Sequence, residues 1–174
     1  DNTLYLQRVA NPGPGSNFSS WVSQGSVSGG AGIALTSRGA QVLLFYVAAD
    51  NVSVYVKESS DYGASFGAPV LVVSAANPVK WLASGINSSG VVALFYALST
   101  GTVYVVKRSG GTWGSPTAWT NTVNQVTGLA CVYMSDWNLA ISGTDSGGNY
   151  LAWTCVYGDG VFQPSGTWSS LMEL

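Results

Sequence analysis

The sequence predicts an all-β protein made of antiparallel four-stranded units. Three observations lead to this prediction: one segment repeats after fifty residues, short apolar runs are rich in β-branched and aromatic side chains, and 22 glycines punctuate those runs. No window longer than about ten residues has the periodicity of an amphipathic helix.

The repeat is clearest along the second strand of each unit. Val42-Leu-Leu-Phe-Tyr46 recurs as Val92-Ala-Leu-Phe-Tyr96. The same ungapped frame aligns 56–59 with 106–109, and the turns that follow align 66–69 with 113–116. The second strand is apolar throughout, as expected where neighbouring sheets cover both of its faces. We therefore predict that Phe45 and Phe95 are equivalent buried residues.

Each complete unit divides into four strands within about 45 residues, the spacing of β-propeller blades. A single repeat domain then consists of a partial unit over 1–30 and complete units over 31–78, 79–124 and 125–174, about three and a half blades. The predicted strands lie at 32–37, 41–48, 52–59 and 66–74; at 80–87, 91–98, 102–108 and 113–120; and at 127–134, 137–143, 149–157 and 161–171. The partial unit supplies only outer strands, Leu4–Val9 and a segment around Trp21.

The strand count also predicts that the chain does not close a ring by itself. The first unit opens with Leu4-Tyr-Leu-Gln-Arg8, which resembles the third strand Val103–Lys107, so its two inner strands are missing. An unpaired apolar edge invites association with another strand. We expect self-association, or a longer chain that completes the propeller.

The composition indicates which classes of partner and which location to expect for the protein. Charged residues make up 8% of the chain and the net charge is −2, with basic residues mostly spread out, so no basic face for nucleic acid is predicted. No apolar stretch approaches the roughly 20 residues of a membrane span. The start at Asp1-Asn-Thr3, the few charges and the many Ser, Thr and Gly favour an extracellular, cell-surface or virion-surface location.

The two cysteines, Cys131 and Cys155, fall on the first and third predicted strands of one unit. A strand between them would separate their backbones by roughly 10 Å, which is too far for an undistorted disulfide. We expect two buried thiols that act as small apolar side chains.

A turn motif suggests a family. Ser59, Asp61, Gly63 and Phe66 have the spacing Ser-x-Asp-x-Gly-x-x-Phe, which resembles the Asp-box of sialidase-type (BNR) propeller repeats. In this resemblance the motif is structural: the carboxylate accepts N–H bonds of its own turn, glycine allows a positive φ, and the aromatic ring closes over the hairpin into the core. The chain is also similar, more loosely, to propeller lectins, including fucose-binding ones.

Catalysis is not predicted. The Arg-Ile-Pro motif of sialidases is absent, and Arg8, Arg38 and Arg108 fall at different positions in their units. Glu58 is read as a solvated carboxylate in a polar turn. Because the chain has no histidine, most metal sites and imidazole chemistry are excluded. No metal and no cofactor are expected.

Ligand binding is the preferred interpretation. Seven Trp and nine Tyr with few charges are typical of a surface that stacks on sugars. Trp21, Trp113 and Trp168 recur at unit ends and are read as core residues. The candidates for ligand contact are Lys80, Trp81, Trp137 and Trp153, with Trp81 opening a strand that would line the central channel.

Three functions remain open. The first is a non-catalytic recognition module that binds a glycan or another surface ligand. The second is a structural or assembly protein of a surface layer, filament or virus particle, which would use the open strand edge. The third is a fragment of a sialidase-like glycoside hydrolase whose catalytic arginines lie elsewhere.

Overall fold

The computed structural model of the chain describes residues 2–9, 18–119, 124–133, 137–144, 147–158, 161–163 and 169–170; within 150–170 it describes the backbone alone. These residues form four antiparallel sheets in chain order. The first unit holds β1 (Thr3–Leu6) and β2 (Val22–Ser26). The second holds β3 (Ile33–Arg38), β4 (Gln41–Val47), β5 (Ser53–Ser59) and β6 (Val70–Ser74).

The third unit holds β7 (Val79–Ile86), β8 (Val92–Leu98), β9 (Val103–Ser109), β10 (Thr112–Trp113) and β11 (Thr117–Ala118). The fourth holds β12 (Gln125–Tyr133), β13 (Trp137–Thr144), β14 (Tyr150–Gly158), β15 (Val161–Gln163) and β16 (Ser169–Ser170). The first four strands of each complete unit pair in sequence order, and β11 and β16 pair with the third strands β9 and β14, so the predicted blade pattern is confirmed.

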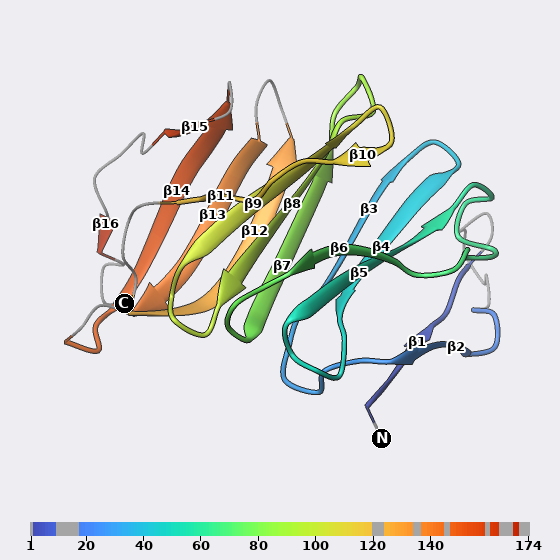
Figure 1. The fold of residues 1–174 in the computed structure, drawn as a ribbon, viewed down its shortest axis with the longest axis horizontal. Coiled ribbons are helices and arrows are strands. Elements are labelled where there is room, and N and C mark those ends of the chain that lie inside the picture. The colour runs from blue at the N-terminus through green and yellow to red at the C-terminus, as the bar shows by residue number, and fades with distance from the viewer. Residues whose placement is uncertain are drawn as a thin grey trace.

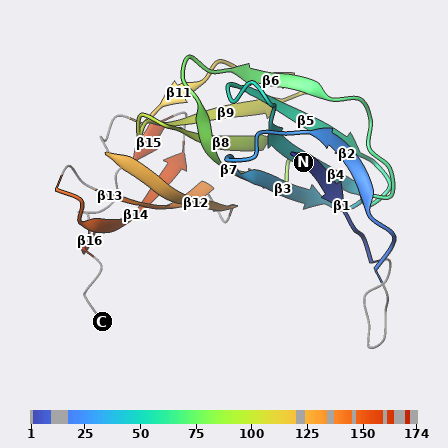
Figure 2. The same ribbon diagram turned by 90° about the horizontal axis from the view of Figure 1, so that it is seen from below.

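The sheets stand side by side along a row, with the first and fourth units at opposite ends (Figure 1). The first strand of each complete unit lies innermost: β7 packs against β3 on one side and β12 on the other. Figure 2 shows β6 and β11 along the outer edge, away from these inner strands. Loops that precede the inner strands are therefore gathered near a common axis.

The cores lie between neighbouring sheets, because the second strands bury both faces. Phe45 and Phe95 are both 0% exposed, as predicted. Phe45 packs with Leu94 in the core between the second and third units. Phe95 packs with Leu139 and Ile141 in the core between the third and fourth units. Each complete sheet thus depends on a neighbour to cover its apolar strands.

At the third strand, the alignment that offsets the two units by fifty residues differs from the structural register by one residue. Leu43 pairs with Glu58, whereas its counterpart Ala93 pairs with Lys107. The reason is the preceding turn: residues 48–52 join β4 to β5, whereas 99–102, one residue fewer, join β8 to β9. Glu58 therefore corresponds to Lys107 and not to Arg108.

Two stacked tyrosine pairs follow the corrected register. Tyr46 and Tyr55 stack at 6.0 Å between ring centroids, and Tyr96 and Tyr104 stack at 5.2 Å in the equivalent place. Burial is the main cause that raises the pKa of the Tyr96 phenol to about 12. The shared geometry shows that the two units use the same packing even where the ungapped sequence match fails.

The fourth strands of the second and third units are shorter than predicted. Prolines explain this: Pro69 precedes β6 and Pro116 separates β10 from β11, and proline has no N–H to donate to a ladder. Trp113 packs edge-to-face on Phe45 at 5.9 Å between ring centroids and joins the core as predicted.

The core prediction for Trp21 is wrong, since its side chain is 65% exposed. The first unit has two described strands instead of four, so a strand that could cover this ring is missing from the described part of the chain. Trp168 lies outside the described residues.

The strand order confirms the separation predicted for the cysteines. Leu139 on β13 pairs with Cys131 on β12 and with Cys155 on β14, so one strand lies between the two cysteines. Among the described residues, no helix is long and apolar enough to cross a membrane. In the same part of the chain, no three His, Cys, Asp or Glu side chains gather as a metal site would require.

Candidate ligand-binding site

A β-bulge sets the geometry of the candidate site. Val79 pairs with Leu98 and Trp81 pairs with Ala97, which leaves Lys80 as the extra residue on β7. A regular strand would turn alternate side chains to opposite faces, but the bulge leaves Lys80 and Trp81 both exposed while Val79 and Leu82 are buried. Bulges re-aim side chains in this way next to many functional sites.

Lys80 and Trp81 line a cavity of about 380 Å³ where the third unit meets the fourth. This size is within the roughly 300–1,000 Å³ range of small-molecule sites. The other lining residues come from the loop before β3, the end of β8 and the start of β12: Gly30, Leu98, Ser99, Gln125, Val126 and Thr127.

A second bulge lies on the opposite wall of this Lys80–Trp81 cavity. Val126 pairs with Gly143 and Gly128 pairs with Ser142, so Thr127 is the extra residue on β12. The Thr127 hydroxyl donates to the Ser142 hydroxyl oxygen at 3.1 Å, which fixes its position. The two inner strands therefore both depart from regular pairing at the end that forms the cavity.

A hydrogen bond at the edge of the Trp81 ring holds the ring in place. Its Nε1–H donates to the carbonyl oxygen of Val126 at 2.9 Å, and 36% of the side chain remains exposed. The neighbouring backbone is fixed as well, because the Gly32 N–H donates to the Lys80 carbonyl oxygen at 2.8 Å. A Cβ at Gly32 would lie 3.3 Å from the Leu82 nitrogen, so glycine permits this close approach.

The chemistry of the cavity suits a neutral polar ligand with an apolar face. An indole ring can stack on C–H groups, while the Gln125 amide, the Ser99 and Thr127 hydroxyls and the Lys80 ammonium offer donors and acceptors. The described lining contains no carboxylate and no histidine. These groups can bind and orient a ligand, and they offer no acid–base pair.

The structure brings two of the four predicted ligand residues together. Trp137 is 8% exposed and packs in the core between the third and fourth units, with its ring 5.1 Å from that of Tyr133, so the prediction of a ligand contact there is wrong. The ring lies at the start of β13 and points inward against Gly85 of β7. The side chain of Trp153 lies outside the described residues.

The sequence analysis missed the three other polar side chains of the lining: Ser99, Gln125 and Thr127. Ser99 belongs to a turn that the sequence does reveal, but nothing in a turn signal indicates a ligand. Gln125 and Thr127 reach the cavity because β12 begins earlier than predicted and bulges. A bulge has no sequence signature in this segment, so the missing signal is tertiary.

The loop after β5 holds Asp61 through a network of its own. The Asp61 carboxylate accepts hydrogen bonds from the Ser59 hydroxyl at 2.7 Å, the Ser65 N–H at 2.9 Å and the Ser65 hydroxyl at 2.6 Å. The buried Ser59 hydroxyl oxygen in turn accepts from the Gly63 N–H at 2.8 Å. Gly63 has a φ of 80°, which favours glycine.

Phe66 departs from the expected position in this loop. Its ring is half-buried beside Gly63 and does not enter the core, and it lines a second cavity next to the first unit.

Hydrogen bonds from Ser65 and Ser59 hold the pKa of the Asp61 carboxyl well below its usual range. A depressed pKa means that the ionised form stabilises the fold above the unfolded value of about 4 and that this contribution is lost as pH falls below it. Asp61→Ala should lower the melting temperature at pH 7 by about 2–4 °C, as the loss of one such network does in a chain of this length.

The difference from the parent chain should shrink at pH 2, measured by circular dichroism melts. Ser60→Ala, an exposed neighbour, is the matched control and should melt like the parent. A variant Asp61→Ala that melts normally but no longer binds ligand would contradict a structural role.

Glu58 is not the solvated carboxylate that the sequence suggested. Its Oε1 lies 2.6 Å from Nη1 of Arg108, and the two side chains are 34% and 19% exposed. The pair joins β5 of the second unit to β9 of the third. The strand prediction 52–59 already included Glu58; the expectation failed because Glu58, near the end of β5, faces the next sheet and meets Arg108 there.

Comparisons with solved structures match this arrangement. The six-bladed lectin of Aleuria aurantia is 21% identical with a TM-score of 0.60, over 94% of this chain and 56% of that chain. The SapL1 lectin, solved with alpha methyl fucoside, is 16% identical with a TM-score of 0.60, over 97% and 60%. The NanB sialidase of Streptococcus pneumoniae is 12% identical with a TM-score of 0.63, over 92% and 28%.

No protein-family profile matches the sequence, and no curated protein does so either. At these identities the likeness establishes the fold. The chain has the fold of about half of a six-bladed β-propeller lectin, and it spans little more than half the length of the lectins that it matches.

Proposed function

We propose that this chain is a non-catalytic carbohydrate-recognition module that binds a sugar in the Lys80–Trp81 cavity. The observation that carries the proposal is the half-exposed Trp81 ring, held by its bond to Val126 beside an amide and two hydroxyls. An aromatic ring beside such groups suits a pyranose, which has a C–H face and an edge of hydroxyls. The solved Aleuria and SapL1 lectins bind fucosides, which supports carbohydrate as the ligand class.

Titration calorimetry of the intact chain, guided by a glycan array, tests this proposal. We expect a defined subset of glycans, with fucosylated glycans a natural first group, to bind with a measurable heat that the free monosaccharide competes away. Absence of binding to every glycan at millimolar concentration would contradict the proposal.

The described carboxylates support a non-catalytic role. Glu58 is paired with Arg108, Asp61 is held by its loop, and the Asp50 carboxylate accepts from the Val52 and Ser53 N–H groups. None of these three lines the Lys80–Trp81 cavity. A fluorogenic sialoside should therefore not be turned over. Turnover that Glu58→Gln abolishes would favour the hydrolase alternative.

A second proposal concerns assembly, and the first unit supports it. The strand β1 pairs with β2 on one edge, and no other described strand pairs with it. Tyr5 and Trp21 are 48% and 65% exposed and border an apolar hollow of about 320 Å³. Two more strands from a second copy or from a longer chain would complete the unit and cover these rings.

Light scattering coupled to size-exclusion chromatography tests whether the chain self-associates. We expect a mass that is a multiple of 18.0 kDa at micromolar concentration, and we expect Tyr5→Lys, which places a charge at the open edge, to shift it toward one chain. A monodisperse species of a single chain at all concentrations would contradict self-association and leave completion by a longer chain to be tested on the longer protein.

A further inference from the structure

A second cavity, distinct from the Lys80–Trp81 cavity, lies between the first and second units. It measures about 650 Å³ and is formed by β1, β2 and the residues near them on one side and by β5 and the Asp61 loop on the other. Its volume falls in the range of small-molecule sites. We call it the first-unit cavity. The residues that matter to the argument are Arg8, Phe18, Ser19, Lys57, Ser65 and Phe66.

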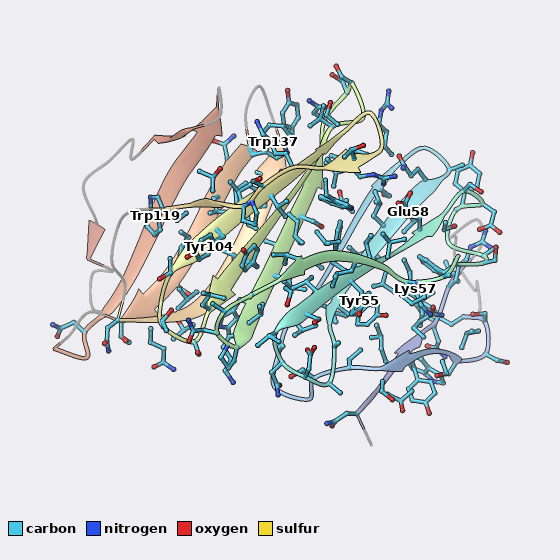
Figure 3. All side chains as sticks on the ribbon, in the orientation of Figure 1. Tyr55, Lys57, Glu58, Tyr104, Trp119 and Trp137 are labelled. Atoms are coloured by element: carbon cyan, nitrogen blue, oxygen red, sulfur yellow. The ribbon has the colours of Figure 1, made fainter. Side chains whose placement is uncertain are left out.

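Two cationic side chains, Arg8 of the first unit and Lys57 of the second, line this cavity. Lys57 points toward the first unit, where its Nζ donates to the Gln24 carbonyl oxygen at 2.8 Å (Figure 3). An ammonium has three donors, so two N–H groups remain for a ligand. Glu58 follows Lys57 along β5 and therefore faces the opposite side, where it pairs with Arg108.

Arg8 comes from the other wall and is fixed through its backbone. Its carbonyl oxygen accepts from the Ser19 N–H at 2.7 Å, and its own N–H donates to the Ser19 hydroxyl oxygen at 3.1 Å. Among the residues that the structure describes, the Arg8 guanidinium forms no ion pair. Its planar fork is therefore available to a carboxylate, which it can bind through two parallel N–H bonds.

No carboxylate belongs to the described lining of the first-unit cavity, so its two positive charges are not neutralised there. The nearby Asp61 carboxylate accepts its hydrogen bonds from Ser59 and Ser65 within its own loop. Two cationic side chains against the single Asp61 carboxylate nearby leave an excess of positive charge at this cavity, which favours an anionic ligand.

The walls also offer aromatic surface. Phe18 is 68% exposed and Phe66 is half-buried, and both line the cavity. Both rings offer apolar surface beside the two cationic side chains. The combination suits a ring-shaped molecule that carries a negative group on its edge.

We propose that the first-unit cavity binds a carboxylate-bearing saccharide residue. The carboxylate lies between Arg8 and Lys57, and the sugar ring packs against Phe66 and Phe18. This inference rests on the proposed function, because that function supplies carbohydrate as the ligand class. It adds an acidic-sugar subsite to the neutral-sugar site at Trp81.

Calorimetry with two matched saccharides tests the inference: one that ends in glucuronic acid, and the same saccharide ending in glucose. We expect the acid to bind at least 10-fold more tightly than the neutral sugar and to weaken several-fold between 0.15 and 0.5 M salt. Arg8→Met should remove that preference, and so should Lys57→Met, which keeps the test available if one variant does not fold. Arg38→Met, which removes an arginine that lines neither cavity, is the matched control and should bind like the parent.

Equal affinity for the two saccharides, or an equal loss in Arg38→Met, would overturn the inference. Benzoate that binds as tightly as the glucuronide would overturn its sugar part, because a general anion site would then suffice. If neutral glycans still bind in a Trp81-dependent way, such results refute the acidic subsite alone. Absence of binding by both saccharides and by every array glycan would refute the proposed function as well.

Discussion

Replacement of Phe45 or Phe95 by alanine should lower the free energy of unfolding by about 3–5 kcal/mol in each case. Both side chains are 0% exposed and lie on second strands that neighbouring sheets cover on both faces. Phe45 also supports Trp113 through an edge-to-face contact, and Phe95 lies at the centre of the core that contains Leu139 and Ile141. Truncation would leave a cavity that a pleated sheet cannot close by relaxation.

Urea titration followed by circular dichroism measures this loss. Leu35→Ala is the control, since Leu35 is an aliphatic side chain on the inner strand β3 that is 54% exposed, and it should change stability by less than about 0.5 kcal/mol. A change below about 1 kcal/mol for either phenylalanine would show that the sheet faces do not pack as described. The slope of unfolding against urea should stay the same if the native state remains compact.

Trp81→Ala should reduce glycan affinity at least ~10-fold, which is about 1.4 kcal/mol and typical of a central aromatic contact. The substitution removes the ring face from the Lys80–Trp81 cavity together with the hydrogen bond to Val126. Trp81→Phe separates the two effects, because it keeps an aromatic face and removes the N–H. We expect an intermediate affinity for that variant.

Trp21→Ala is the matched control for this prediction. Trp21 is the more exposed of the two rings, at 65% against 36%, and it lines neither the Lys80–Trp81 cavity nor the first-unit cavity. Its removal should leave glycan affinity unchanged. If Trp21→Ala weakens binding as much as Trp81→Ala does, exposure of an aromatic ring and not the built cavity would be the determinant.

The sequence was sufficient for the fold because the signals are local and repeated. Apolar second strands and hairpin turns act within one sheet, the fifty-residue match repeats them in the next sheet, and the three signals agree. The burial of Phe45 and Phe95 follows from the same pattern. The register of the third strand does not follow from that pattern. The turn after β8 is one residue shorter, so Lys107 occupies the position that Glu58 has in the second unit.

The candidate site was predictable only in part, for a physical reason. Lys80 and Trp81 stood out as a charged and an aromatic residue at the start of an inner strand, and they do meet in one cavity. Trp137 begins the second strand of the next unit in a similar polar context, yet its ring packs inward. Which of two such rings is exposed depends on the bulge at Lys80 and on the neighbouring sheet, and neither is encoded in the local sequence.

The position of a bound sugar in a crystal of the intact protein, soaked with the glycan that an array selects, tests the central claim most directly. We expect the sugar ring to lie in van der Waals contact with the Trp81 indole, with hydroxyls within hydrogen-bond distance of Gln125 and Thr127. A sugar that occupies another surface while the Lys80–Trp81 cavity holds only solvent would contradict the account.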